Sequence, residues 1–314
     1  MSITILRTAD AWWVRTRSGA APIETDATTT GELLADHDRI EAARARATMD
    51  TVDPDSLELV SPVTAPCRVV AQMTNYASHV EDSGLDPETI PLTFFRKTSG
   101  SISGPYDDIV RPAHVRFLDY EAEIGLVIGR TLAVGTDVVA DNWASFIAGL
   151  VVTNDVSARD VQLPKTQFFE SKSYPTFTPA GPALVLLDVD ELKRFGELRL
   201  RLWVNGELRQ DAVVDGDMVY SPLEALQSLS RFQQLDPGDL LLTGTPAGTA
   251  LSAPSKPIEM IASLLPPATK WKVFFKKQAQ NPKYLKHGDI VEIAIGTDDG
   301  AIDLGHQRTV VRGT

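Results

Sequence analysis

Two glutamates one residue apart, Glu121 and Glu123, have the spacing that most directly implies chemistry. They lie in the segment Phe-Leu-Asp-Tyr-Glu-Ala-Glu-Ile-Gly (117–125), and side chains at i and i+2 of a β-strand point to the same face. Asp119 has the same parity, so three carboxylates would share one face of a strand whose other face is apolar. Such a face is either solvated or neutralised by a cation, and the spacing leaves both alternatives open.

A further acid, Asp155, follows the apolar run 146–152, at the point where a buried strand would end. Together with Glu121 and Glu123 it forms a set of oxygen ligands without a neighbouring His or Cys. Such a set suits Mg²⁺, Mn²⁺ or Ca²⁺ better than Zn²⁺.

Most of the chain that must position these acids is predicted to form strands. Clear helical patterns are few, and the best of them cover 141–146 and 223–230. The expected strands are β-branched or Leu-rich runs bounded by Gly, Pro, Asp and Asn, at 68–73, 121–128, 149–153, 183–187, 198–204, 240–243 and 290–295. This pattern favours a mainly β domain with curved sheets.

The first part of the chain has a different pattern. Strands are expected at 2–7 and 12–16, followed by a helix through Leu33 and Leu34 and another at 40–49. A tract with two prolines, 60–66, then reads as a linker. We therefore divide the chain into a small N-terminal α/β domain, 1–65, and a main domain, 66–314.

Composition limits the partners of this 314-residue chain. Its net charge of −12 argues against nucleic acids and anionic membranes, which are bound through clustered Lys and Arg. The single cysteine, Cys67, excludes an internal disulfide. No apolar run approaches the roughly 18 residues of a membrane span, so we expect a cytoplasmic protein.

The segment 252–287 departs from this acidic composition, because it carries seven lysines against the single acid Glu259. It also carries three aromatic residues, Trp271, Phe274 and Phe275. One interpretation is a solvated surface excursion. The other is a lid or a subunit contact that meets the acidic remainder of a partner chain.

Six motifs in order resemble the fumarylacetoacetate hydrolase family over roughly 66–314. They are Asn75-Tyr76-Ala77-Ser78-His79, Asp119-Tyr120-Glu121-Ala122-Glu123, Asn154-Asp155-Val156-Ser157-Ala158-Arg159, Lys172-Ser173 before Pro179-Ala180-Gly181-Pro182, Asn205-Gly206-Glu207, and Pro237-Gly238-Asp239 with Thr243-Gly244-Thr245-Pro246. The resemblance implies the family's mixed β-sandwich or roll, and residues 1–65 look like the small leading domain of longer bacterial members.

The resemblance also implies roles for individual residues. Glu121, Glu123 and Asp155 would bind Mg²⁺, or Mn²⁺ or Ca²⁺, which holds the keto-acid end of a dicarbonyl substrate. In the family's hydrolases a His paired with a carboxylate activates water, and His79 stands where that His is expected. The usual Glu is replaced by Asp82, with Glu81 as an alternative partner.

Further matching positions would surround the substrate. Lys172 would neutralise enolate charge, and the expected substrate-binding residues are Tyr76, Arg159, Gln162 and Thr245. Lys97 matches a Phe-x-Lys element of the family, and local solvation explains it equally well. Pro175 stands where many members have Asp, so a specificity different from the commonest members is expected.

We therefore predict a metal-dependent hydrolase that cleaves a carbon–carbon bond in a β-diketone or acylpyruvate-type 2-oxo or 2,4-dioxo acid, in the breakdown of an aromatic compound. Decarboxylases, isomerases and hydratases of 2-oxo acids, for example oxaloacetate, use the same metal site and are the alternative. A metal-stabilised binding module without turnover is the alternative from another class. The resemblance also implies a homodimer.

Overall fold

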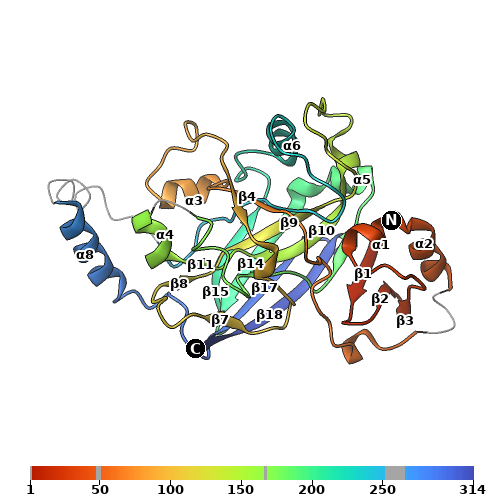
Figure 1. Cartoon of the computed structure of the whole chain (residues 1–314), viewed down its shortest axis with the longest axis horizontal. Coiled ribbons are helices and arrows are strands. Elements are labelled where there is room, and N and C mark those ends of the chain that lie inside the picture. Colours follow the sequence, from red (N-terminus) through yellow and green to blue (C-terminus); the bar gives the residue numbers. More distant parts are fainter. Residues whose placement is uncertain (1, 47–50, 166–167, 252–265) are drawn as a thin grey trace.

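A nine-stranded sheet forms the centre of the computed structural model, which describes residues 2–46, 51–165, 168–251 and 266–314 (Figure 1). In spatial order its strands are β3 (Gly19–Pro22), β2 (Trp12–Thr16), β1 (Ile3–Arg7), β13 (Leu184–Leu186), β10 (Ile147–Asn154), β9 (Ala122–Ile128), β16 (Leu240–Leu242), β4 (Val69–Gln72) and β5 (Phe94–Lys97). The strands expected near these positions are confirmed to within a few residues.

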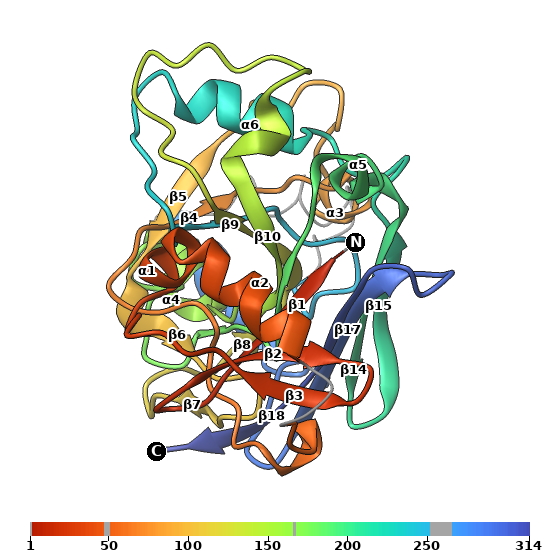
Figure 2. The ribbon, with the colours of Figure 1, turned by 90° about the vertical axis from the view of Figure 1, so that its right-hand side faces the viewer.

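A five-stranded sheet packs on one face of the first, with contacts from β10 and β9 (Figure 2). Its strands, in order, are β15 (Glu207–Val213), β14 (Leu198–Val204), β17 (Ile290–Thr297), β18 (Asp303–Gly313) and β7 (Ile109–Arg111). Two short pairs join β11 (Ser157–Ala158) to β8 (Leu118–Asp119), and β12 (Thr178–Pro179) to β6 (Ile102–Ser103).

The core lies on both faces of the nine-stranded sheet, which is why all seven residues of β9 are buried. The larger cluster fills the space between the two sheets and includes Ile124 and Leu126. On the opposite face, α1 (Thr30–Ala35) and α2 (His37–Arg46) contribute the fully buried Leu33 and Ile40. The mainly β, two-sheet architecture expected from the sequence is confirmed.

The remaining helices are short, and they connect or cover the sheets. They are α3 (Ala77–Asp82), α4 (Arg159–Lys165), α5 (Val189–Leu192), α6 (Pro222–Leu229) and α8 (Pro267–Gln278), with 3₁₀ turns at Pro54–Ser56, Ser99–Ser101, Trp143–Phe146 and Phe195–Glu197. The helical pattern expected at 141–146 corresponds to a 3₁₀ helix over Trp143–Phe146, which ends where the chain enters β10 at Ile147. The helix expected at 40–49 ends at Arg46 among the described residues, and 47–49 lie outside them.

The N-terminal strands belong to the central sheet. β1 pairs with β13 through Ile3↔Leu186 and Ile5↔Leu184, so hydrogen bonding continues across the predicted boundary between 65 and 66. The division into two domains stays a prediction. None of the helices in the described ranges is long and apolar enough to cross a membrane.

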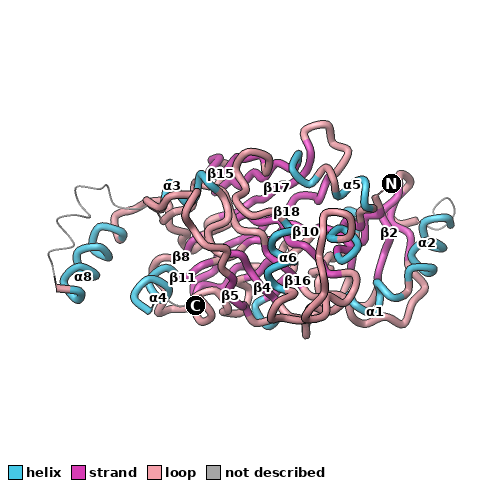
Figure 3. The backbone as a smooth tube through the Cα atoms, turned by 90° about the horizontal axis from the view of Figure 1, so that it is seen from above, coloured by secondary structure: helices cyan, strands magenta, loops and turns pink. Residues whose placement is uncertain are grey.

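Helix α8 extends away from the sheets, at the end of the molecule opposite the N-terminal strands (Figures 1 and 3). In α8, the ring of Phe275 stacks on the ring of Phe117, with the two centroids 5.6 Å apart. After the helix, Asn281 Nδ2 donates to the Ala250 carbonyl at 2.7 Å. These contacts anchor the second half of the Lys-rich segment, whereas 252–265 lie outside the described residues. A lid or subunit contact by this segment stays a prediction.

Candidate active site

Three buried carboxylates meet where β9 begins and β10 ends. Antiparallel pairing sets Glu123 opposite Thr153, and the Asp155 N–H donates to the Glu121 carbonyl at 2.8 Å. One oxygen from each of Glu121, Glu123 and Asp155 lies within 4.8 Å of the others. The strand parity inferred from the sequence therefore holds, although Glu121 precedes the first residue of β9.

The acidic face is not solvated. Glu121 is 4% exposed, Glu123 is 2% exposed, and Asp119 and Asp155 are fully buried. A group of carboxylates removed from water requires compensating cations or protons. The alternative of a solvated strand face is therefore wrong.

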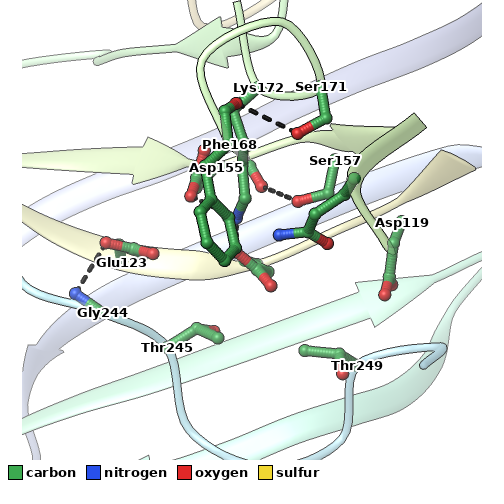
Figure 4. A network of polar contacts seen from close by, with 12 residues as sticks. Asp119, Glu123, Asp155, Ser157, Phe168, Ser171, Lys172, Gly244, Thr245 and Thr249 are labelled. Atoms are coloured by element: carbon green, nitrogen blue, oxygen red, sulfur yellow. Dashed lines mark hydrogen bonds and ion pairs between the residues drawn. The ribbon is translucent and has the colours of Figure 1, made fainter. Parts of the chain in front are cut away.

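Two lysines provide part of that compensation. Lys172 lies in the loop that also presents Phe168 (Figure 4). Its ammonium donates to Glu121 and, at 2.5 Å, to Asp155. Lys97, the last residue of β5, donates to Asp155 Oδ1 at 2.5 Å and to the Phe177 carbonyl at 2.7 Å. The interpretation of Lys97 as a merely solvated residue is wrong, because this side chain is buried against a proposed metal ligand.

Arg159 joins the triad to a fourth acid. Its guanidinium donates to Asp119 at 2.8 Å, to Gln162 Oε1 at 2.9 Å, and also to Glu121. Asp119 lies outside the triad and accepts the backbone N–H of Ala250 at 2.7 Å. Asp119 therefore orients Arg159 and also fixes the backbone at Ala250, from which the chain leads to α8.

The charges of this cluster do not balance, because four buried carboxylates face three cations, Lys97, Lys172 and Arg159. The excess falls on Glu123, whose carboxylate accepts one hydrogen bond among the described residues, from the Gly244 N–H at 2.7 Å (Figure 4). Burial, with repulsion from Asp155 and Glu121, raises the pKa of Glu123 well above its usual value. Burial would also raise the pKa of Glu121, but the nearby cations outweigh it and lower that pKa to about 2.

This donor set fits a divalent ion. Three buried carboxylates within reach of one another, with an uncompensated negative charge on one of them, form an oxygen site of the type that hard cations occupy. The triad could therefore bind a divalent metal ion.

His79 is the third residue of α3 and lines the same cavity. Its ring is half-buried, and its Nδ1 has no hydrogen-bond partner among the described residues. Burial lowers the pKa of His79 although the Glu121 charge opposes the shift. Glu81 and Asp82 are exposed, and no hydrogen bond joins either to His79 within the described ranges, so their pairing with His79 stays a prediction.

The position of α3 depends on a residue far away in the sequence. Tyr76, the N-cap, makes no capping hydrogen bond with its side chain. Instead Asp217 accepts the Ser78 backbone N–H and the Ser78 hydroxyl, both at 2.7 Å. The same hydroxyl accepts the Ala247 N–H at 3.1 Å, so Ser78 and Asp217 fix the His79 helix against the loop after β16.

Replacing Asp217 with Ala should lower the free energy of unfolding by about 1–2 kcal/mol, because it removes the cap of α3. It should also lower kcat about tenfold or more, because His79 loses its fixed position. Urea unfolding and steady-state kinetics test both effects. A variant with reduced stability and unchanged kcat would contradict the positioning role, and Asp215→Ala, at an exposed aspartate two residues earlier, is the matched control.

The cavity over the triad is small, about 50 Å³. Phe95 and Phe168 form an aromatic wall, with ring centroids 5.2 Å apart, and the Lys172 ammonium lies 5.2 Å from the Phe95 centroid. The residues around the cavity are Gln72, Met73, Thr74, His79, Phe95, Glu121, Glu123, Asp155, Arg159, Gln162, Phe168, Lys172, Gly244 and Thr245.

Most of the residues expected from the sequence therefore come together, with two exceptions. Tyr76 is fully buried in the core between the sheets and does not line the cavity, and its hydroxyl has no partner among the described residues. Asp82 lies outside the cavity lining. Thr245 lines the cavity, and its hydroxyl accepts Gln210 Nε2 at 2.8 Å.

Five cavity residues are neither among the site residues expected from the sequence nor in the quoted motifs: Gln72, Met73, Thr74, Phe95 and Phe168. The aromatic pair carries no local signal, because its members are 73 positions apart in the sequence. Gln72 does carry one, since it is a lone amide that ends the apolar run Val69-Val70-Ala71.

Comparison with known proteins places this site in context. The family model for the fumarylacetoacetate (FAA) hydrolase C-terminal region matches residues 68–312. Oxaloacetate tautomerase Fahd2a, mitochondrial, of Rattus norvegicus is 36% identical over 212 residues, which are 67% of this chain and 66% of the relative. The match spans 65–66% of the length of the first three curated relatives, just under two thirds.

Solved structures resemble the whole chain. A probable 2-hydroxyhepta-2,4-diene-1,7-dioate isomerase from Mycobacterium abscessus is 29% identical with a TM-score of 0.74, covering 100% of this chain and 99% of that one. A fumarylacetoacetate hydrolase from Exiguobacterium antarcticum is 26% identical with a TM-score of 0.69, covering 99% and 100%.

Proposed function

The chain belongs to the fumarylacetoacetate hydrolase family, and from this premise we propose that it is a divalent-ion-dependent enzyme that interconverts the keto and enol forms of an oxaloacetate-like 2-oxo acid. The tautomerase and isomerase names of its relatives support this reaction class better than carbon–carbon hydrolysis. The reaction moves one proton between a carbon and an oxygen, and it consumes no water.

The observation that carries this choice is the state of His79. A hydrolase needs an activated water, and a His paired with a carboxylate is the device that the family's hydrolases use for it. Here Glu81 and Asp82 are exposed and make no hydrogen bond to His79 among the described residues, whereas the cations around the triad are in place. A keto–enol conversion needs the cations around the triad and does not need a His–carboxylate pair.

The residues of the chain suit the proton transfer. Lys172 and Arg159 are buried cations beside Glu121, and they would stabilise negative charge that develops on the substrate oxygen. His79 lines the same cavity and can accept a proton from the substrate and return it. A divalent ion held by Glu121, Glu123 and Asp155 would supply Lewis acidity that favours the enolate.

The hydrolase remains the second candidate, because α3 carries His79 and Asp82 three residues apart and therefore on neighbouring positions of one helix face. A change of side-chain rotamer could bring the two together. Its substrate would be an acylpyruvate-type acid.

The tautomerase and the hydrolase predict different effects of Glu81→Gln and Asp82→Asn on the reaction rate. We expect each variant to change the rate of oxaloacetate keto–enol conversion by less than about threefold, because neither acid contacts the cavity, whereas a hydrolase would lose about 10²-fold or more. The measurement follows the enol absorbance of oxaloacetate, and of an acylpyruvate, with Mg²⁺ or Mn²⁺. Cleavage of the acylpyruvate by the wild type, with loss of it in Asp82→Asn, would overturn the tautomerase in favour of the hydrolase.

Other features of the protein complete the proposal. Mg²⁺ is the proposed ion, with Mn²⁺ or Ca²⁺ as alternatives, since the ligands are all carboxylates. A homodimer and a cytoplasmic location are also proposed, whereas oxaloacetate tautomerase Fahd2a of Rattus norvegicus is described as mitochondrial.

A further inference from the structure

Helix α8 presents a set of unpaired lysines to the solvent. At about 3.6 residues per turn, its four lysines lie on the side of the helix opposite Trp271 and Phe275. All four are exposed, none of them forms an ion pair within the described ranges, and Val273, which is 55% exposed, lies in their middle. An exposed valine among unpaired cations favours contact with an acidic surface that has an apolar centre. We call this set the basic face, and its residues are Lys270, Lys272, Val273, Lys276 and Lys277.

A surface of this acidic kind follows His79 in the sequence. Residues 81–88, which we call the acidic segment, contain four exposed acids and no Lys or Arg. Among the residues that the structure describes, none of these acids is in an ion pair. Leu85, which is 56% exposed, lies between them and lines an apolar cavity of about 250 Å³ together with Met73 and Ile90. The acidic segment therefore has the opposite charge to the basic face and a similar apolar centre.

The two surfaces lie in the same half of the molecule. Helix α3, which ends with the first two acids of the acidic segment, is in the half that also contains α8 (Figures 1 and 3). Within one chain no ion pair joins the two surfaces in the described parts, so each keeps its charge unpaired. A two-fold axis at this end would place the basic face of each copy on the acidic segment of the other, and the same contact would form twice.

We propose that the basic face and the acidic segment form a reciprocal interface between two copies of this chain. In each contact four lysines meet four acids, and Val273 of one copy packs near Leu85 of the other. The net charge of −12 also makes a second copy a suitable partner for a basic helix. The interface would brace the helix that carries His79, because the acidic segment begins on α3. It would form whichever reaction the site catalyses.

Charge reversal on either surface tests this interface, with the dimer Kd of the full chain measured by sedimentation velocity. The double variants Lys270→Glu/Lys272→Glu and Asp86→Lys/Glu88→Lys should each raise the Kd about 100-fold or more. Each reversal replaces attraction with repulsion, and the two-fold axis doubles the effect. For the wild type, raising NaCl from about 0.05 M to about 0.5 M should raise the Kd about tenfold or more, because salt screens exposed charges.

A mixture of the two double variants gives the decisive measurement. Their heterodimer should form with a Kd within about tenfold of the wild-type value, because reversed lysines meet reversed acids in one contact and native partners meet in the other.

Lys283→Glu/Lys286→Glu is the matched control, since it makes the same charge change at exposed lysines outside α8 and should change the Kd less than about threefold. A monomeric wild type, in which α8 closes on the acidic segment of its own chain or on nothing, would overturn the proposal. A dimer that withstands both reversals would also overturn it, as would a mixture of the variants that stays monomeric.

Discussion

Replacing Glu123 with Ala should abolish divalent-ion binding and lower turnover by about 10³-fold or more, because it removes one of three ligands and the Lewis acid with it. Titration calorimetry with Mn²⁺ and metal analysis of the purified variant measure the first effect. Enol absorbance assays measure the second.

Stability gives an independent measurement for the same variant. Glu123 carries the uncompensated charge of the cluster, so the ion-free variant should be at least as stable as the ion-free wild type. Mn²⁺ should raise the Tm of the wild type and leave that of the variant unchanged. Glu58→Ala, at an exposed glutamate outside the cavity, should behave as the wild type. A Glu123→Ala protein that keeps one equivalent of ion would refute the metal site.

Replacing Lys172 with Met should have the opposite effect on stability. Lys172 is buried between Glu121 and Asp155, and removal of one partner from a buried ion pair typically costs about 3–5 kcal/mol of unfolding free energy. A divalent ion should restore much of this loss, because it neutralises the same two carboxylates. Turnover should still fall about 10²–10³-fold, since the ammonium no longer stabilises the developing oxyanion.

Urea unfolding with and without Mn²⁺ separates these effects of Lys172→Met. Lys193→Met makes the same substitution at an exposed ion pair with Asp190 and should leave stability and turnover unchanged. If Lys172→Met retained full turnover with the ion bound, Lys172 would be a structural counter-charge only. Lys172 lies beside the three metal ligands and is not itself a ligand. Loss of ion binding in Lys172→Met would contradict this assignment.

The carboxylate triad was predictable because its signals are local. The alternation of a strand fixes the common side of Glu121 and Glu123, and the end of an apolar run fixes where Asp155 emerges. Strands β9, β10 and β14 were predictable for the same reason. Strands β15 and β18 were not, because their sequences, ELRQDAV and DLGHQRTVVRG, mix charged and apolar residues without an apolar run.

The parts of the site that could not be predicted depend on contacts between distant segments. Asp217 caps α3 across 139 residues of sequence, and no local pattern indicates that pairing. Whether His79 meets Glu81 or Asp82 depends on side-chain rotamers, which motif spacing does not define.

The pairing of β1 with β13 also has a consequence for which backbone groups lie at the edge of the central sheet. Without β1, the backbone of β13 would be an open sheet edge, able to hydrogen-bond to another chain. The N-terminal strands move that edge outward to β3, a strand of four residues that ends at Pro22. A short strand with a proline is a poor template for a foreign strand, so we expect a chain that lacks the leading strands to aggregate more readily than the full chain.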